Sequence, residues 1–372
     1  MDLAFLNPLY EHPGPWASVY VDTSRHAEDT PEQLHVAADS AARELGELGA
    51  DEATWRAVLN AIEDLRHSPD QYGRALFARA GTIVADPSLA RPPQGAYQVV
   101  WAPLPRVAPL LDLAGEDPVA IVAYVDRKGA DFELRSALGR QKAGAVVGRQ
   151  WPIRRTKTAD WSEKHFQLKV ENTWEHNAAE IADALSVCEE EVQADLLILV
   201  GDVRERREVH ERLPKRLHDR VVESSHGTGS RLLDEDVEQI RAEYVRRRVE
   251  AELDRFRAAR APDDEGRVRA VEGVPELVEA GRMHRLEELL IRSDGPDLQQ
   301  EVWVGEDPDQ LAMHRTELKI LGEQHSWPAR ADDALLRCAV ATDATALSLA
   351  PVAAALAEDE PAGGMGAILR WK

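Results

Sequence analysis

"VAIVAYVDRKGADFELRSA", residues 119–137, lies near the middle of the 372-residue chain and decides how its central part folds. Two runs rich in apolar and β-branched residues flank the segment Asp126–Gly129, where a glycine can supply a positive φ, so this stretch predicts a β-hairpin. Downstream, "ADLLILVGD" (194–202) is a short apolar run of the kind that forms a buried parallel strand. Strands that alternate with helical patterns in this way predict an α/β domain.

The parts of the chain before and after this central stretch also contain both strand and helix patterns. Alternating apolar residues in "WASVYVDTS" (16–24) predict a half-buried strand. Two helical patterns follow, separated by "GELGAD" (46–51), whose glycine and aspartate are typical of a C-cap and an N-cap. Helical patterns are found at about 31–48, 51–65, 170–191, 205–214, 233–260, 271–284 and 328–343. Further strands are expected within 73–86, 97–104, 219–225, 285–294 and 300–306.

A proline-rich stretch, "PLPRVAPLLDLAGEDP" (103–118), indicates a domain boundary near residue 115. A chain of 372 residues exceeds one typical hydrophobic core. We therefore predict an α/β (α+β) protein with three consecutive domains at 1–115, 116–260 and 261–372.

Composition indicates a soluble globular protein, with 44% hydrophobic and 30% charged residues. No apolar run approaches the roughly 20 residues that cross a bilayer, and the N-terminus shows no cationic start or cleavage signal. Only Cys188 and Cys338 are present, far apart in sequence, which favours reduced thiols over a disulfide scaffold. We expect a cytoplasmic protein without contact to a membrane.

The net charge of −22 is concentrated at the two ends of the chain. Residues 1–72 hold 14 acidic and 4 basic residues, and residues 261–372 hold 22 acidic and 11 basic residues, whereas the middle is nearly neutral. An acidic protein is repelled by phosphates, so this balance argues against indiscriminate binding to nucleic acid. It leaves room for a local cationic segment that contacts RNA.

One such segment is "RQWPIRRTKTADWSEKHFQLK" (149–169), which interleaves cations with aromatic rings. Cations neutralise phosphates, and aromatic rings stack on unpaired bases, so the pattern fits contact with RNA. The candidate RNA-binding residues are Arg149, Trp151, Arg154, Arg155, Lys157, Trp161, Lys164, His165 and Lys169. The alternative is a solvated loop whose tryptophans pack into the domain core.

Other motifs give no catalytic, metal or cofactor site. His165 and His176 lack the companion ligands of a zinc site. "HGTGS" (226–230) lacks the lysine and spacing of a phosphate-binding loop and is better explained as the capped start of a helix. Two arginine-rich runs, 204–220 and 241–260, also carry acids at helical spacing, which favours salt-bridged helix faces.

Four segments in order carry a resemblance to a known family: "PWASVYVDTS" (15–24), "IVAYVDRKGADFEL" (121–134), "RADDALLRCAVATDATAL" (330–347) and "GGMGAILRWK" (363–372). With them the chain resembles the bacterial branch of the archaeo-eukaryotic class-I release factor and pelota superfamily, close to the actinobacterial dormancy-associated, Balon-like ribosome hibernation factors. The resemblance implies an RNase H-like middle domain and a kink-turn-binding-protein-like C-terminal domain.

The resemblance also implies where functional loops would lie. Release factors carry a Gly-Gly-Gln loop ahead of the long helix of the middle domain, and this chain has "TADWSEKHF" (158–166) there and no Gly-Gly-Gln at all. The Asn-Ile-Lys-Ser decoding motif is also missing, with "GELGADEATW" (46–55) roughly in its place. We therefore expect neither peptide release nor stop-codon reading.

What the resemblance then implies is a non-enzymatic, monomeric dormancy and stress factor that occupies the ribosomal A site. Its partners would be ribosomal RNA near the peptidyl-transferase centre and elongation factor Tu. Two alternatives stay open. One is a peptidyl-tRNA or tRNA-end hydrolase on stalled ribosomes, with His165, Glu163 or Glu171 as general base. The other is a transcription-linked or stress-signalling scaffold without RNA contact.

Overall fold

The computed structural model describes residues 3–11, 14–24, 30–67, 72–114, 117–126, 129–136, 139–146, 174–227, 230–262, 265–355 and 361–371. The chain forms two compact units. The first combines residues 1–116 with residues 246–372, and the second consists of residues 117–245. Both units contain sheets and helices, so the predicted α/β class is confirmed.

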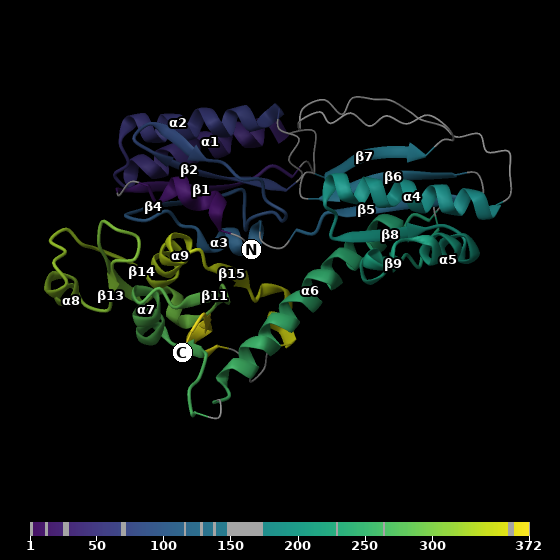
Figure 1. Cartoon of the computed structure of the whole chain (residues 1–372). Coiled ribbons are helices and arrows are strands. Elements are labelled where there is room, and N and C mark those ends of the chain that lie inside the picture. Colours follow the sequence, from purple (N-terminus) through teal and green to yellow (C-terminus); the bar gives the residue numbers. More distant parts are fainter. Residues whose placement is uncertain are drawn as a thin grey trace. The chain divides into compact units, whose positions relative to one another are not determined.

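The N-terminal part of the first unit is an antiparallel sheet in the order β3-β2-β1-β4, partly covered by two helices (Figure 1). The strands are β1 (Trp16–Asp22), β2 (Gly73–Arg79), β3 (Thr82–Ala85) and β4 (Tyr97–Ala102), and the helices are α1 (Thr30–Glu47) and α2 (Glu52–Asp64). Val19 and Val21 of β1 pack with Leu45 of α1 and Ile62 of α2. The predicted N-cap is confirmed, because the Asp51 carboxylate accepts a hydrogen bond from the backbone N–H of Thr54 at 3.0 Å.

The opposite face of this sheet is also buried. Trp16, Tyr20 and Phe77 share one core with Leu277 and Leu335 from the C-terminal part of the chain. The prediction of a half-buried strand at 16–24 was therefore wrong: even Ser18 is only 1% exposed, because the C-terminal part covers the second face. The N-terminal and C-terminal blocks form one unit with a common core.

The C-terminal part holds a four-stranded sheet in the order β10-β16-β11-β15 and a small sheet in the order β13-β12-β14. The strands are β10 (Ala270–Glu272), β11 (Leu286–Ile291), β12 (Glu301–Val304), β13 (Leu311–Ala312), β14 (Trp327–Arg330), β15 (Thr345–Ser348) and β16 (Met365–Leu369). The helices are α3 (Ala108–Leu113), which precedes the second unit in sequence, α7 (Val274–Arg282), α8 (Arg315–Ile320) and α9 (Ala331–Ala341). Short 3-10 turns lie at Ala4–Leu9, Leu65–His67, Lys215–Arg220, Pro296–Gln299, Ala350–Ala355 and Ala362–Gly364.

The helix predicted from residue 271 begins later than expected. Gly273 has a φ of 81°, a conformation that favours glycine and is not helical, and Pro275 lies in the first helical turn, where its missing N–H costs nothing. The helix α7 therefore starts at Val274. The preceding residues pair with β16 as strand β10, with Ala270 opposite Ile368.

The second unit is built on a five-stranded sheet in the order β7-β6-β5-β8-β9. Its strands are β5 (Ala120–Asp126), β6 (Gly129–Ser136), β7 (Gly139–Val146), β8 (Leu196–Val200) and β9 (Val221–Glu223). The predicted hairpin is confirmed, with Asp126 opposite Gly129, and β8 and β9 run parallel to β5. Three antiparallel strands followed by two parallel ones is the arrangement expected of an RNase H-like domain.

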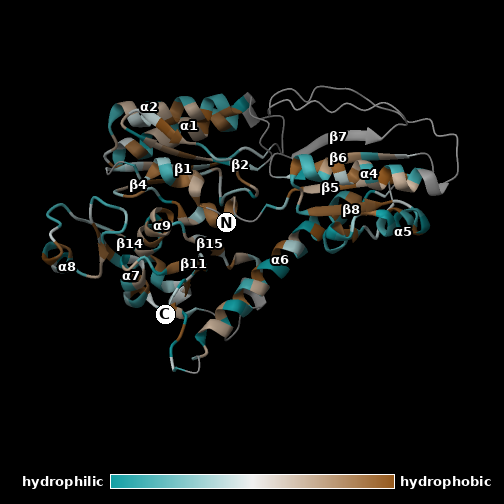
Figure 2. Ribbon diagram, in the orientation of Figure 1, coloured by the Kyte–Doolittle hydropathy of each residue, from teal (hydrophilic) through white to brown (hydrophobic). Residues whose placement is uncertain are grey.

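Helices cover both faces of this sheet. Ile181 and Leu185 of α4 (Trp174–Val192) and Val209 of α5 (Val203–Arg212) pack on one face, and Val237 of α6 (Leu233–Arg260) packs on the other. In the ribbon coloured by hydropathy, β8 is mostly hydrophobic, whereas α5 is largely hydrophilic and α6 mixes the two kinds of residue (Figure 2). Across the ranges that the structure describes, no helix combines the length and apolarity needed to cross a bilayer.

Candidate functional site

The predicted RNA-contact loop falls within residues 147–173, which lie outside the described residues. This applies to all nine candidates, Arg149, Trp151, Arg154, Arg155, Lys157, Trp161, Lys164, His165 and Lys169, and to the alternative general bases Glu163 and Glu171. The segment connects the edge strand β7 to α4, whose apolar face packs on the sheet of the second unit. The roles of these residues stay predictions.

The two arginine-rich runs are described, and the prediction of salt-bridged faces is confirmed. In the first run, Arg216 and Arg220 both bind the carboxylate of Glu189 in α4, at 2.6 and 2.8 Å, and Arg207 and Arg212 pair with acids on α5 itself. Further arginines of the second run pair with acids along α6: Arg241 with Glu238, Arg246 with Glu250 and Arg257 with Asp254.

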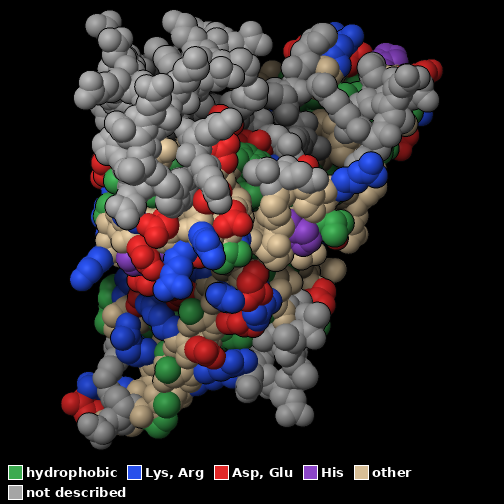
Figure 3. Space-filling view, turned by 90° about the vertical axis from the view of Figure 1, so that its right-hand side faces the viewer, with side chains coloured by type: hydrophobic (Ala, Val, Ile, Leu, Met, Phe, Trp, Pro, Cys, Tyr) green, Lys and Arg blue, Asp and Glu red, His purple; other side chains and the backbone are tan. Residues whose placement is uncertain are grey.

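Figure 3 shows one face of the molecule. Among the described residues on this face, lysine and arginine side chains lie next to aspartate and glutamate side chains, so no large patch carries a single sign of charge. A carboxylate that already binds a guanidinium competes with a phosphate for the same cation. These helices are therefore poor phosphate-binding surfaces.

A cluster of serine, histidine and aspartate lies where β9 ends and α6 begins. Ser224 and Ser225 donate hydrogen bonds to the carboxylate of Asp236, and the Ser225 Oγ–His226 Nδ1 distance is 2.9 Å. Burial raises the pKa of Asp236, but the hydrogen bonds from both serines outweigh it, so the pKa is lowered.

This cluster does not have the geometry of a catalytic triad. In a triad the hydroxyl and the carboxylate bind opposite ring nitrogens of the histidine. Here the Ser225 hydroxyl and the Asp236 carboxylate, at 3.6 Å, approach the same nitrogen, Nδ1 of His226. The cluster fixes the chain between β9 and α6, in agreement with the predicted helix start, where Ser230 Oγ accepts the N–H of Leu232 at 3.2 Å.

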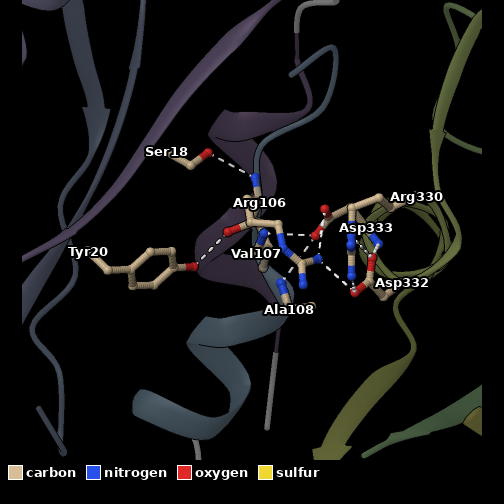
Figure 4. A network of polar contacts seen from close by, with 8 residues as sticks. All are labelled: Ser18, Tyr20, Arg106, Val107, Ala108, Arg330, Asp332 and Asp333. Atoms are coloured by element: carbon tan, nitrogen blue, oxygen red, sulfur yellow. Dashed lines mark hydrogen bonds and ion pairs between the residues drawn. The ribbon is translucent and has the colours of Figure 1, made fainter. Parts of the chain in front are cut away.

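A largely buried polar network of the first unit surrounds Arg106 (Figure 4). Its guanidinium donates to the carboxylates of Asp332 at 2.7 Å and Asp333 at 3.0 Å, at the start of α9. Its backbone N–H donates to Ser18 Oγ at 2.9 Å, and its backbone carbonyl accepts the hydroxyl of Tyr20 at 2.6 Å. One residue thus connects β1 of the N-terminal sheet to a helix of the C-terminal part.

The two aspartates of this network are fully engaged. Asp332, whose side chain is 0% exposed, also accepts from the guanidinium of Arg330 at 2.9 Å. Asp333 accepts the backbone N–H groups of Val107 at 3.0 Å and Ala108 at 3.2 Å, where α3 begins. Burial, and then the neighbouring Asp332 charge, raise the pKa of Asp333 to about 6, against the opposing effect of Arg106.

Two guanidinium groups face two carboxylates, so the network is close to electrically neutral. Both carboxylates are buried and hydrogen-bonded, so neither is free to bind a substrate, although the side chains of Arg106 and Arg330 are 15% and 33% exposed. Its role is to hold the two blocks of the first unit together. Sequence reasoning missed it: "RADDALLRC" shows only a helix with acids in its first turn, and nothing marks Arg106 as their partner.

A small pocket lies beside this network, about 270 Å³ with its opening to solvent included. Trp16 and Trp327 are among its lining residues, and the buried guanidinium of Arg337 donates to the backbone carbonyls of Gly305, at 2.9 Å, and Glu306. The hydroxyl of Tyr10 is buried in its wall and has no hydrogen-bond partner among the described residues.

Tyr10 and Tyr20 are buried in the same core, so the stability effects of their replacement with phenylalanine can be compared directly. Tyr20→Phe leaves the carbonyl of Arg106 without its donor, and we expect it to lower the free energy of unfolding by about 1–2 kcal/mol. Tyr10→Phe removes a hydroxyl that has no partner, and we expect no loss, or a small gain, of stability. Urea unfolding of both variants measures the difference. Equal losses would contradict the assignment of these hydroxyls.

The remaining candidates for chemistry are clusters of metal-ligating side chains and the two cysteines. The described part of the chain contains no group of three or more His, Cys, Asp or Glu side chains that could hold a metal ion. Cys188 and Cys338 are both free and buried, and burial raises the pKa of each thiol to about 12. Both are therefore neutral at physiological pH and poor nucleophiles.

Comparison with known proteins agrees with this structure. Residues 119–262, which comprise most of the second unit and the whole of α6, match the model of bacterial archaeo-eukaryotic release factor family 2. Over these residues the chain is similar to bacterial archaeo-eukaryotic release factors, as the resemblance of its sequence implies.

Relatives are found over nearly the whole chain. Two Mycobacterium tuberculosis proteins, named uncharacterized protein Rv2629 (strain H37Rv) and uncharacterized protein MT2704 (strain CDC 1551), are each 28% identical over 365 residues, which cover 96% of this chain and 94% of the relative. Among solved structures, Archaeoglobus fulgidus Pelota is 15% identical over 80% of both chains with a TM-score of 0.35. A ribosome-bound archaeal Pelota is 12% identical over 100% of this chain and 94% of its own, with a TM-score of 0.39.

Proposed function

We propose that this protein binds the ribosome and occupies its A site as a mimic of a release factor that does not hydrolyse peptidyl-tRNA, protecting idle ribosomes in dormancy or stress. The observation that carries the proposal is the match of residues 119–262 to a release-factor family in a chain without a Gly-Gly-Gln sequence. A relative of release factors that lacks this triplet can still enter the A site, but it lacks the glutamine that directs water at the ester.

The charge distribution supports the same proposal. The segment 149–169 holds six lysines and arginines against two acids, whereas many arginines of the two long runs are paired with carboxylates. Of the three basic stretches, this segment therefore has the largest excess of cations over acids, four against three in each of the runs 204–220 and 241–260. We propose that it contacts ribosomal RNA near the peptidyl-transferase centre, that the protein acts as a cytoplasmic monomer, and that elongation factor Tu delivers or accompanies it.

Co-sedimentation with purified 70S ribosomes tests this function. We expect the protein to pellet with ribosomes at low and moderate salt, and to release no labelled peptide from stalled complexes even in excess. Absence from the ribosomal pellet at both salt concentrations would refute the proposal. Peptide release that disappears in a His165→Ala variant would replace it with the hydrolase alternative.

A further inference from the structure

Two large apolar side chains protrude from the small sheet region of the C-terminal part. Ile320 is 85% exposed and Leu321 is 61% exposed, whereas Leu318, two residues earlier in α8, is completely buried. We call this pair the apolar knob. Adjacent, highly exposed aliphatic residues are a feature of interaction surfaces, because water contact with them is unfavourable.

The backbone holds the apolar knob in a fixed position. The helix α8 ends in a Schellman motif: the N–H of Glu323 donates to the carbonyl of Leu318 at 2.9 Å, and the N–H of Gly322 donates to that of Lys319 at 3.1 Å. Gly322 has a φ of 99°, which this motif requires and glycine adopts readily. A rigid apolar pair loses little entropy when a partner covers it.

Further contacts anchor α8 to its surroundings. The guanidinium of Arg315, at the first residue of α8, lies 5.4 Å from the ring centre of Trp303 in β12, and Leu318 packs inward. Glu317 lies 3.9 Å from Arg282 of α7. Contacts at the first residue of α8 and the Schellman motif at its end therefore both hold the helix that carries the knob.

The surroundings of the knob are acidic. Residues 301–330 contain six acids and three bases, and the third base, Lys319, precedes the knob. Arg315 lies over Trp303 and Arg330 pairs with Asp332, while among the acids Glu317 lies near Arg282 and Glu306 near His325. Glu323 follows the knob after Gly322 and lies against Gly305, next to the acidic turn Glu306–Asp309. An acidic rim repels RNA phosphates and attracts lysines and arginines.

We propose that the apolar knob docks into an apolar pocket with a basic rim on a ribosomal protein. This inference rests on the proposed function and adds the kind of partner that the C-terminal part recognises. An apolar core surrounded by a polar rim is the usual anatomy of a protein–protein interface, and charges of opposite sign across the rim favour the correct partner.

The test uses the full chain with the photo-crosslinker p-benzoylphenylalanine in place of Leu321, bound to purified 70S ribosomes. We expect a crosslink to a basic ribosomal protein, identified by mass spectrometry. A crosslink to ribosomal RNA or to a second copy of the chain, or no crosslink from the bound protein, would overturn the inference.

Two double variants measure how much the apolar knob contributes to the affinity for ribosomes. Ile320→Asp/Leu321→Asp is expected to weaken ribosome binding about tenfold or more, because it buries charge in an apolar pocket. Val36→Asp/Leu48→Asp changes two other exposed residues, 59% and 50% exposed, by the same charge and serves as the control, which should bind within about twofold of the original chain. Circular dichroism checks that both variants are folded.

The outcomes separate this inference from the proposed function. Equal binding of the unchanged chain and the knob variant would overturn the inference and leave the ribosome as partner. Failure of the unchanged chain to bind ribosomes would overturn both. If both double variants weakened ribosome binding equally, the effect would come from net charge, and the inference about the apolar knob would be overturned.

Discussion

Replacement of Arg106 with methionine is expected to lower the free energy of unfolding by about 3–5 kcal/mol, because it leaves the buried carboxylates of Asp332 and Asp333 without their shared guanidinium. The methionine keeps much of the apolar stem, so the loss reports charge and hydrogen bonding more than packing. Urea unfolding followed by tryptophan fluorescence measures it. The cost should be largest at pH values above the raised pKa of Asp333, where both carboxylates are charged.

The sign of that pH dependence follows from the direction of the shift. Because the folded-state pKa of Asp333, about 6, is above its unfolded value, the carboxyl favours the folded state most at low pH, and this contribution is lost as the pH rises through about 6. Removal of Arg106 raises this pKa further and moves the loss to higher pH.

A surface arginine provides the control. Arg207 and Glu211 form an ion pair at 2.9 Å in which both side chains are mostly exposed, and Arg207→Met should leave the urea midpoint unchanged. If Arg106→Met were no more destabilising than Arg207→Met, the network would not hold the two blocks together. Arg106→Met/Asp333→Asn should recover part of the loss, since it removes the charge of Asp333, which loses its cation, whereas Asp332 keeps Arg330.

Replacement of Arg154, Arg155 and Lys157 together with alanine is expected to weaken ribosome binding and to reduce the slope of log K against log salt by about two to three. Each lost phosphate contact removes roughly 0.7–0.9 from that slope, because fewer counterions are released on binding. Filter binding or sedimentation at several salt concentrations measures both quantities.

The matched control removes three other cations from the same unit. Arg207, Arg212 and Arg216 each pair with a glutamate, so their replacement with alanine should change the slope much less. Equal changes in the two triple variants would mean that the effect comes from net charge. An unchanged slope in the first variant would favour the alternative, in which residues 149–169 form a solvated loop that does not contact RNA.

The elements that local patterns determine were predicted well. The hairpin around Asp126–Gly129 and the bounds of α6 follow from residues close in sequence, since turn chemistry and helical periodicity act over a few positions. The strand β7 was missed because "GRQKAGAV" shows no clean alternation. It is a strand because it pairs with β6 along its whole length.

The site could be predicted only in part, for a physical reason. Arg106 and Asp332 are 226 positions apart, and no periodicity connects residues that tertiary packing brings together. The same packing buried β1 on both faces, although its sequence predicts a half-buried strand. By contrast, pairs such as Arg207 and Glu211 lie one helical turn apart and could be predicted from spacing.

The division of the first unit between the two ends of the chain bears on the order in which the protein folds during its synthesis. Residues 117–245 are contiguous, so the second unit can fold as soon as they have left the ribosomal exit tunnel. The sheet made before them has one face whose covering residues, such as Leu277 and Leu335, are translated more than a hundred positions later. That apolar face must stay exposed in the meantime, so the N-terminal segment, although first to emerge, is among the last to reach its native core and the part of the nascent chain most in need of a chaperone.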